Sequence, residues 1–200
     1  MQVYTSQHEN KGPAPRCAVC GEIIGPYQYL PPFHDIELEL EPGVTQFGDL
    51  LSFSGDALLV SEQLKKAWKE EGLIGLSGFH EVEVRRIIGE KRATEACPTY
   101  FHANVARSRA AIDQKASVLI RDASKPLCLE CRTGGLFKRL ARIVLEANTW
   151  SGEDIFIARG LPGTLLVTEK FKVFSESHAW KNSLLIDAED FSVDYYKGEN

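Results

Sequence analysis

CAVCG at residues 17–21 and CLEC at residues 128–131 are two cysteine pairs of identical spacing in opposite halves of the chain. Each pair is followed, after a similar interval, by nearly the same phrase: LLVSE at residues 58–62 and LLVTE at residues 165–169. Similarity of this kind between distant segments indicates an internal repeat. Two copies are too few for a solenoid, so we expect two halves of one compact, pseudo-symmetric molecule.

The first copy predicts two short strands and a helix. Residues 50–53 and 57–60 are apolar runs separated by Ser-Gly-Asp, which is typical of two strands joined by a turn. Ser61 is a favourable N-cap, and Leu64 and Trp68 follow it at helical spacing. We therefore expect a helix that begins near Ser61 and directs both apolar side chains into the core.

The second copy repeats this order. The run at residues 153–158 and the apolar residues 165–167 correspond to the two strands. Thr168 corresponds to the N-cap, and Phe171 and Phe174 then lie on one helical face. The reuse of both the cap and the apolar face supports the internal repeat.

The fold class predicted from these patterns is α+β, with a mostly antiparallel sheet and paired CxxC knuckles. Residues 48–76 and 154–185 are expected to be equivalent strand-turn-strand-helix-strand units, one in each half. The halves themselves are predicted to be residues 1–97 and residues 98–200. Further strands are expected from period-two alternation or β-branched runs at residues 36–40, 82–84, 143–145, 184–186 and 191–195.

The two cysteine pairs are candidate metal ligands. A C-x-x-C spacing lets two thiolates reach one ion from a tight turn, and four thiolates at ~2.3 Å complete a tetrahedral structural zinc site. The sequence therefore predicts a zinc site made by Cys17, Cys20, Cys128 and Cys131. Because 107 residues separate Cys20 from Cys128, only the fold can bring the pairs together.

Other interpretations of the cysteines stay open at this point. The pairs could be ordinary thiols that pack as small apolar residues, because a free cysteine is often buried. A redox motif is a third interpretation, although neither pair opens a recognisable βαβ helix. Cys97 lies outside both pairs, and its expected role is that of a small buried residue.

Composition and motifs exclude several function classes. The net charge is −5 with both signs interspersed, whereas nucleic-acid-binding proteins carry a basic face, so no nucleic-acid partner is expected. No run approaches 18 apolar residues and no apolar signal core occurs near the N-terminus, so we expect a cytoplasmic protein without a membrane segment. No catalytic motif occurs among the scattered histidines, so no enzymatic activity is expected.

The cysteine pairs, WSGEDIF at residues 150–156 and LLVTEKF at residues 165–171 together resemble the bacterial double-CXXCG motif proteins. The resemblance covers residues 17–196. Members of that family are immunity proteins, which protect a bacterium from a cognate polymorphic toxin. The resemblance therefore implies a non-catalytic protein whose partner is a toxin. Arg132 replaces the glycine of the family motif, so the second knuckle is expected to turn differently.

The leading hypothesis is a cytoplasmic immunity protein that binds and neutralises one toxin domain. The alternative is a zinc-stabilised regulator, or an enzyme with a site between the two halves. Because an acidic protein complements a basic toxin, the binding face should gather carboxylates around aromatic residues. The candidate segments are residues 35–41, Glu70 with Glu71, and residues 187–194, with Tyr195 and Tyr196 as nearby aromatic residues.

Overall fold

The computed structural model describes residues 2–5, 12–27, 35–54, 56–89 and 96–195. The strands in this part are β1 (Gln2–Thr5), β2 (Ile36–Glu39), β3 (Leu50–Ser54), β4 (Ala57–Ser61), β5 (Leu76–Val82), β6 (Val84–Ile88), β7 (Tyr100–Ala111), β8 (Val118–Arg121), β9 (Phe137–Ala141), β10 (Ile155–Arg159), β11 (Leu165–Val167) and β12 (Ser192–Asp194). The helices are α1 (Glu62–Glu70) and α2 (Glu169–His178), which confirms the α+β class. Neither helix in the described part is long and apolar enough to cross a membrane.

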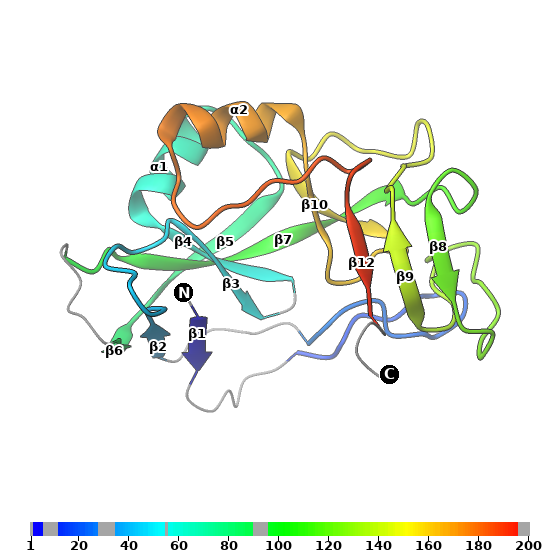
Figure 1. The fold of residues 1–200 in the computed structure, drawn as a ribbon, viewed down its shortest axis with the longest axis horizontal. Helices are drawn as coiled ribbons and strands as arrows, with labels where there is room; N and C mark the ends of the chain where they lie inside the picture. Colours follow the sequence, from blue (N-terminus) through cyan, green and yellow to red (C-terminus); the bar gives the residue numbers. More distant parts are fainter. Residues whose placement is uncertain (1, 6–11, 28–34, 55, 90–95, 196–200) are drawn as a thin grey trace.

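The strands form three sheets around the long strand β7 (Figure 1). β4 and β5 flank the first half of β7 and are antiparallel to it, whereas β10 pairs in parallel with its second half. β3 extends this sheet beyond β4, and β11 extends it beyond β10. The other two sheets have the orders β1-β2-β6 and β12-β9-β8. The central sheet therefore combines strands from both predicted halves of the chain.

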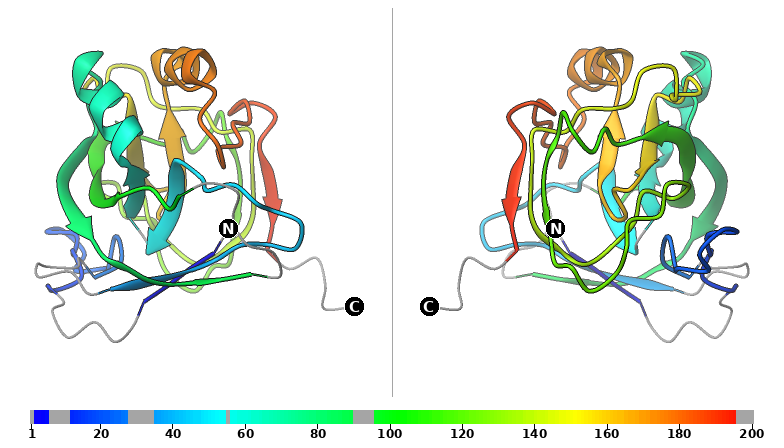
Figure 2. Two further views of the ribbon diagram at one scale, coloured as in Figure 1. Left: turned by 90° about the vertical axis from the view of Figure 1, so that its left-hand side faces the viewer. Right: turned by 90° about the vertical axis from the view of Figure 1, so that its right-hand side faces the viewer.

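Both helices cover the same side of the central sheet and lie side by side (Figure 2). Leu64 and Trp68 of α1 and Phe171 and Phe174 of α2 are all buried, as the sequence predicts. The Trp68 ring lies 6.1 Å from the Phe171 ring and 6.2 Å from the Phe174 ring, between centroids. Each such side chain stabilises the fold by about 1.5 to 3 kcal/mol when fully buried, so this cluster joins the two helices into one core.

Both predicted N-caps are confirmed. The Ser61 hydroxyl oxygen accepts a hydrogen bond from the backbone N–H of Leu64 at 3.2 Å, and the Thr168 hydroxyl oxygen accepts one from that of Phe171 at 3.3 Å. Each bond satisfies one of the backbone donors that have no partner inside the first helical turn.

Asp49 and Asp154 connect each hairpin to the helix of the other unit. The Asp49 carboxylate accepts hydrogen bonds from its own helix cap at 2.8 Å and from the backbone N–H of Lys181, beyond α2, at 3.1 Å. The Asp154 carboxylate does the same with its own cap at 3.2 Å and with Ile74, beyond α1, at 2.9 Å. The backbone N–H of each aspartate donates to the carbonyl of that same Lys181 or Ile74. The contacts are thus reciprocal.

Two predicted strands are wrong. Residues 184–186 are not paired with any described strand, so the unit at 154–185 lacks the last strand that its counterpart has. Residues 143–145 contain only an isolated bridge from Leu145, and the strand of this region is β9, which ends at Ala141. Alternation and β-branching identify residues that fit a strand, but a strand also needs a neighbour to pair with. The strands predicted at 36–40 and 191–195 are confirmed as β2 and β12.

Substitution of Asp154 with alanine should lower the free energy of unfolding by about 2 to 4 kcal/mol, because it removes a buried carboxylate that accepts hydrogen bonds from the backbone N–H of Ile74 and the hydroxyl of Thr168. Chemical denaturation of the purified variant measures this change. Asp190→Ala, at an exposed position, is the matched control and should change stability by less than about 0.5 kcal/mol. Equal effects of the two substitutions would contradict the proposed role of Asp154.

Candidate metal centre

The two cysteine pairs lie in loops of the same backbone form, here called the first cysteine loop (residues 17–22) and the second cysteine loop (residues 128–133). In the first loop, the Cys17 N–H donates to the Glu22 carbonyl at 2.8 Å and the Gly21 N–H donates to the Cys17 carbonyl at 2.9 Å. The bonds at the corresponding positions of the second loop are 2.8 and 2.9 Å long. Both cysteines of each pair therefore project from one tight turn.

Arg132 does not make the second loop turn differently. Its φ is 59°, and that of Gly21, at the corresponding position of the first loop, is 73°, so both residues adopt the left-handed conformation. This conformation costs a residue with a side chain about 1 to 2 kcal/mol. The Arg132 guanidinium donates to the Glu146 carboxylate at 2.8 Å, which holds the residue in place. The expectation of a different turn was wrong because tertiary contacts outweigh the local preference.

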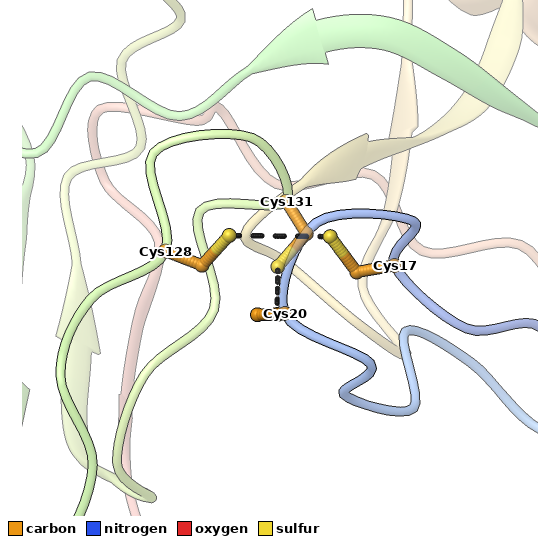
Figure 3. Close-up of side chains that lie close together, drawn as sticks. All are labelled: Cys17, Cys20, Cys128 and Cys131. Carbon is orange, nitrogen blue, oxygen red and sulfur yellow. Dashed lines mark hydrogen bonds between the residues drawn. The ribbon is translucent and has the colours of Figure 1, made fainter.

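The structure brings all four predicted ligands together (Figure 3). The four sulfur atoms lie within 4.8 Å of one another, with 3.9 Å between those of Cys17 and Cys128 and 3.7 Å between those of Cys20 and Cys131. Tetrahedral coordination with metal–sulfur bonds of about 2.3 Å requires sulfur–sulfur distances of about 3.8 Å. Each loop supplies two ligands, and the two distances between sulfurs of different loops given above match edges of such a tetrahedron.

Backbone N–H groups direct two of the thiols toward the thiolate form. The backbone N–H of Cys131 is the largest cause that lowers the pKa of Cys128 to about 7, and that of Cys20 lowers the pKa of Cys17. A backbone hydrogen bond from Glu22 also favours the Cys20 thiolate, but burial and hydrogen bonds with the other three thiols raise its pKa to about 12. Four adjacent thiolates repel one another, so a bound cation is what allows all of them to ionise.

Two arginines attach the cysteine loops to the central sheet. The Arg107 guanidinium, on β7, donates to the carbonyl of Ile24, just after the first loop, at 2.8 Å. The Arg159 guanidinium, on β10, donates to the carbonyl of Glu130, inside the second loop, at 3.0 Å. Because Arg107 pairs in register with Ile157, two residues before Arg159, the pairing of β7 with β10 places the two loops side by side.

A third contact links the loops directly, since the Lys125 ammonium lies 2.9 Å from the Glu22 carboxylate. The sequence did not identify Lys125, Arg107 or Arg159 as residues that position the cysteine loops. A single charged residue in a sequence does not show which residue it contacts in the fold. Gly25 is a clearer signal, because a Cβ at this position would overlap the Arg107 guanidinium. A side chain at residue 25 would therefore displace the Arg107 guanidinium from its present position.

The remaining candidate residues lie elsewhere. Cys97 packs against the core cluster beneath β2 and β4, where burial raises the pKa of its thiol. The three acidic segments lie on β2, at the end of α1 and around β12. β2 and β12 belong to different sheets, on the left and right of Figure 1. Tyr196 lies outside the described residues.

A structural metal in this site would contribute its binding energy to folding. Purified protein should contain about one metal ion per chain, and Cys128→Ser should lose the ion and unfold at a lower temperature. Elemental analysis and thermal denaturation measure both effects. Cys97→Ser is the matched control, and it should keep the ion. If wild-type protein and Cys128→Ser respond identically to a strong chelator, the four cysteines are packing residues only.

Metal binding should also release protons, because the thiol of Cys20 keeps its proton far above neutral pH and must lose it to become a ligand. The affinity of the metal-free protein for zinc should therefore fall as the pH falls. Calorimetric titration in buffers of different ionisation enthalpy counts the protons released. An affinity that does not change with pH would exclude thiolate ligation.

Comparison with known proteins adds no independent assignment. No protein-family model matches the chain, and no curated protein matches it. The function must therefore be argued from the geometry of the molecule, and the resemblance to the double-CXXCG motif proteins stays an expectation.

Proposed function

We propose that Cys17, Cys20, Cys128 and Cys131 hold one structural zinc ion, and that the protein is a cytoplasmic immunity protein that neutralises a cognate bacterial toxin by binding it. The observation that carries the first part is the convergence of four sulfurs from loops 111 residues apart. The second part rests on the resemblance to the double-CXXCG motif proteins and on the physical arguments below.

Zinc is the metal that this ligand set favours. Thiolates are soft ligands, and four of them in a tetrahedron are typical of structural zinc sites. Four protein ligands leave no coordination position for a substrate, so the ion stabilises the fold and does not take part in a reaction. The burial of Cys17 and Cys131 supports the same role.

We further propose that the chain is an internal repeat whose two halves, residues 1–97 and 98–200, meet at the zinc ion. The two caps and the reciprocal bonds of Asp49 and Asp154 support this proposal. The residues that end the helices support it as well: Gly72 and Ala179 both adopt positive φ, 64° and 51°. In each case the N–H of the next residue donates to the carbonyl four positions before the positive-φ residue. Such a helix end is common at glycine and costly at alanine, so its reuse at Ala179 favours inheritance from one unit.

A binding role agrees with the chemistry of the surface better than catalysis does. Within the described residues, the four cysteines are the only cluster of three or more potential metal ligands. A cavity of about 170 Å³ lies beside Cys17 and Cys131, but its Arg107 is paired with Asp56 and its Arg159 with Glu130. This cavity is smaller than most sites for small ligands, which measure about 300 to 1,000 Å³, so the surroundings of the cysteines favour a structural role for the ion. The net charge of −5 favours a basic partner, such as a toxin that acts on nucleic acid.

Co-expression tests this function. Cells that make a toxin encoded beside this gene should die, and cells that also make this protein should survive, because the toxin is held in an inactive complex. Affinity capture with tagged protein should recover the toxin at a one-to-one ratio. Cys97→Ser should protect as well as the wild type, whereas Cys128→Ser should protect less because less of it is folded.

Failure to protect against every neighbouring toxin would contradict the immunity proposal. Such a failure would not contradict the proposed zinc site, because metal content and thermal stability are measured on the isolated protein.

A further inference from the structure

In the first unit, β7 fills the space between β4 and β5. Five residues of β4 pair with residues 100–104 of β7, and β5 pairs with the same stretch from the other side. The first N–H of α1, that of Glu62, donates to the carbonyl of Thr99 at 3.0 Å, just before β7 begins. The Lys65 ammonium lies 3.3 Å from the centroid of the Phe101 ring on β7. The helix therefore contacts the strand beneath it through both backbone and side chain.

The corresponding space in the second unit is a groove. β11 takes the place of β4, and residues 183–187, here called the strap, take the place of β5. The strap leaves α2 and runs as an extended chain across the molecule toward β12 (Figure 1). Residues 164–169 and 182–188 line a groove of about 470 Å³, and no described strand pairs with the outer edge of β11. In the second unit, β11 and the strap thus take the positions of β4 and β5. The groove lies at the position that β7 occupies in the first unit.

Backbone donors on both sides of this groove are unused. Within the described residues, the N–H groups of Leu184, Leu185 and Ile186 donate no backbone hydrogen bond, and neither does that of Glu169, the counterpart of Glu62. Exposed edges of this kind are templates for another strand. The donors of the strap and of α2 therefore match those that β7 satisfies in the first unit.

The groove combines an apolar lining with an acidic end. Leu184 is 85% exposed and Ile186 is 56% exposed, whereas Ile155 and Phe171 form a buried apolar wall. Adjacent exposed apolar side chains of this size mark interaction surfaces. At the end of the strap, the exposed carboxylates of Asp187, Glu189 and Asp190 take part in no ion pair within the described residues. At the opposite end, Lys172 is already paired with Glu169.

We propose that this groove receives an extended basic segment of a partner protein, which adds a strand to β11. The segment lies antiparallel to β11, as β7 lies antiparallel to β4, and donates and accepts main-chain hydrogen bonds along the edge. Alternate apolar side chains enter the groove, and lysine or arginine residues reach the carboxylates at the end of the strap. This inference rests on the proposed function in one respect, because the proposed function identifies the partner protein as the toxin.

A peptide probe tests the groove without knowledge of the toxin. A short fluorescent peptide of alternating lysine and valine, blocked at both ends, should bind the intact protein, and the same peptide with glutamate in place of lysine should not. Binding is measured by fluorescence anisotropy. Hydrogen exchange with the bound peptide should slow at the amides of β11 and of the strap, and not at those of β6, which lies at the edge of a different sheet.

Two pairs of variants locate the site. Leu184→Ser should weaken binding of the lysine–valine peptide about tenfold, and Leu129→Ser, also exposed but in the second cysteine loop, should leave binding unchanged. The double variant Glu189→Gln with Asp190→Asn should weaken binding about three- to tenfold, whereas Glu81→Gln with Glu83→Gln should not. All six substitutions in these four variants are at exposed positions, so each variant should fold, as circular dichroism will verify.

Main-chain pairing has its own test. N-methylation of alternate residues removes every second N–H of the peptide while it keeps the side chains. Of the two possible alternating analogues, at least one should lose binding about tenfold or more. Full binding by both analogues would overturn strand addition. Equal loss in the groove variants and their controls would overturn the location of the site.

The proposal and the immunity function fail in different ways. If the peptide does not bind but the protein still captures a toxin and protects cells, the groove inference is wrong and the function stands. If the peptide binds in the groove but no neighbouring toxin is neutralised, the groove inference stands and the immunity function is wrong.

Discussion

The parallel pairing of β7 with β10 is the contact on which the rest of the molecule depends. It joins the two hairpin–helix units into one sheet, and it places Arg107 beside the strand that carries Arg159. Each arginine holds one cysteine loop through a backbone carbonyl. Parallel strands need a long connection, and the segment between β7 and β10 supplies it and contains the second cysteine loop. The pairing of β7 with β10 thus positions the two cysteine loops, and the candidate metal site depends on it.

The reciprocal bonds of Asp49 and Asp154 complete this arrangement. Each carboxylate joins its own helix cap to the chain that leaves the other helix, so neither unit can shift without breaking these partly buried hydrogen bonds. Such bonds are costly to leave unmade in a low-dielectric interior. The aspartates hold the units together on the helix side of the sheet. The four sulfurs lie together where the two cysteine loops meet, and a bound ion would link the loops and remove the repulsion between the thiolates.

The proposed binding site lies where the structures of the two units differ. Where the first unit has β7 between two strands, the second has a groove with unused backbone donors and exposed Leu184 and Ile186. A self-contained fold blunts such an edge with charge, proline or a covering segment. Here the charge lies at the end of the strap, in Asp187, Glu189 and Asp190, and leaves the strand edge open. We propose that this charge favours a basic partner. One open strand edge on a scaffold with a candidate metal site suits the binding role that we propose for this protein.

The sequence alone determined the features that depend on neighbours in the chain. Ser61 and Thr168 cap their helices, the apolar faces of both helices are buried, and each C-x-x-C forms one tight loop, because these are effects of a few adjacent residues. Only the tertiary structure decided the rest. Residues 184–186 have the pattern of a strand but no partner, and Arg132 turns as a glycine would because distant contacts hold it. The meeting of the four sulfurs likewise depends on Arg107 and Arg159, whose partners are remote in sequence, and no local pattern encodes a contact across so many residues.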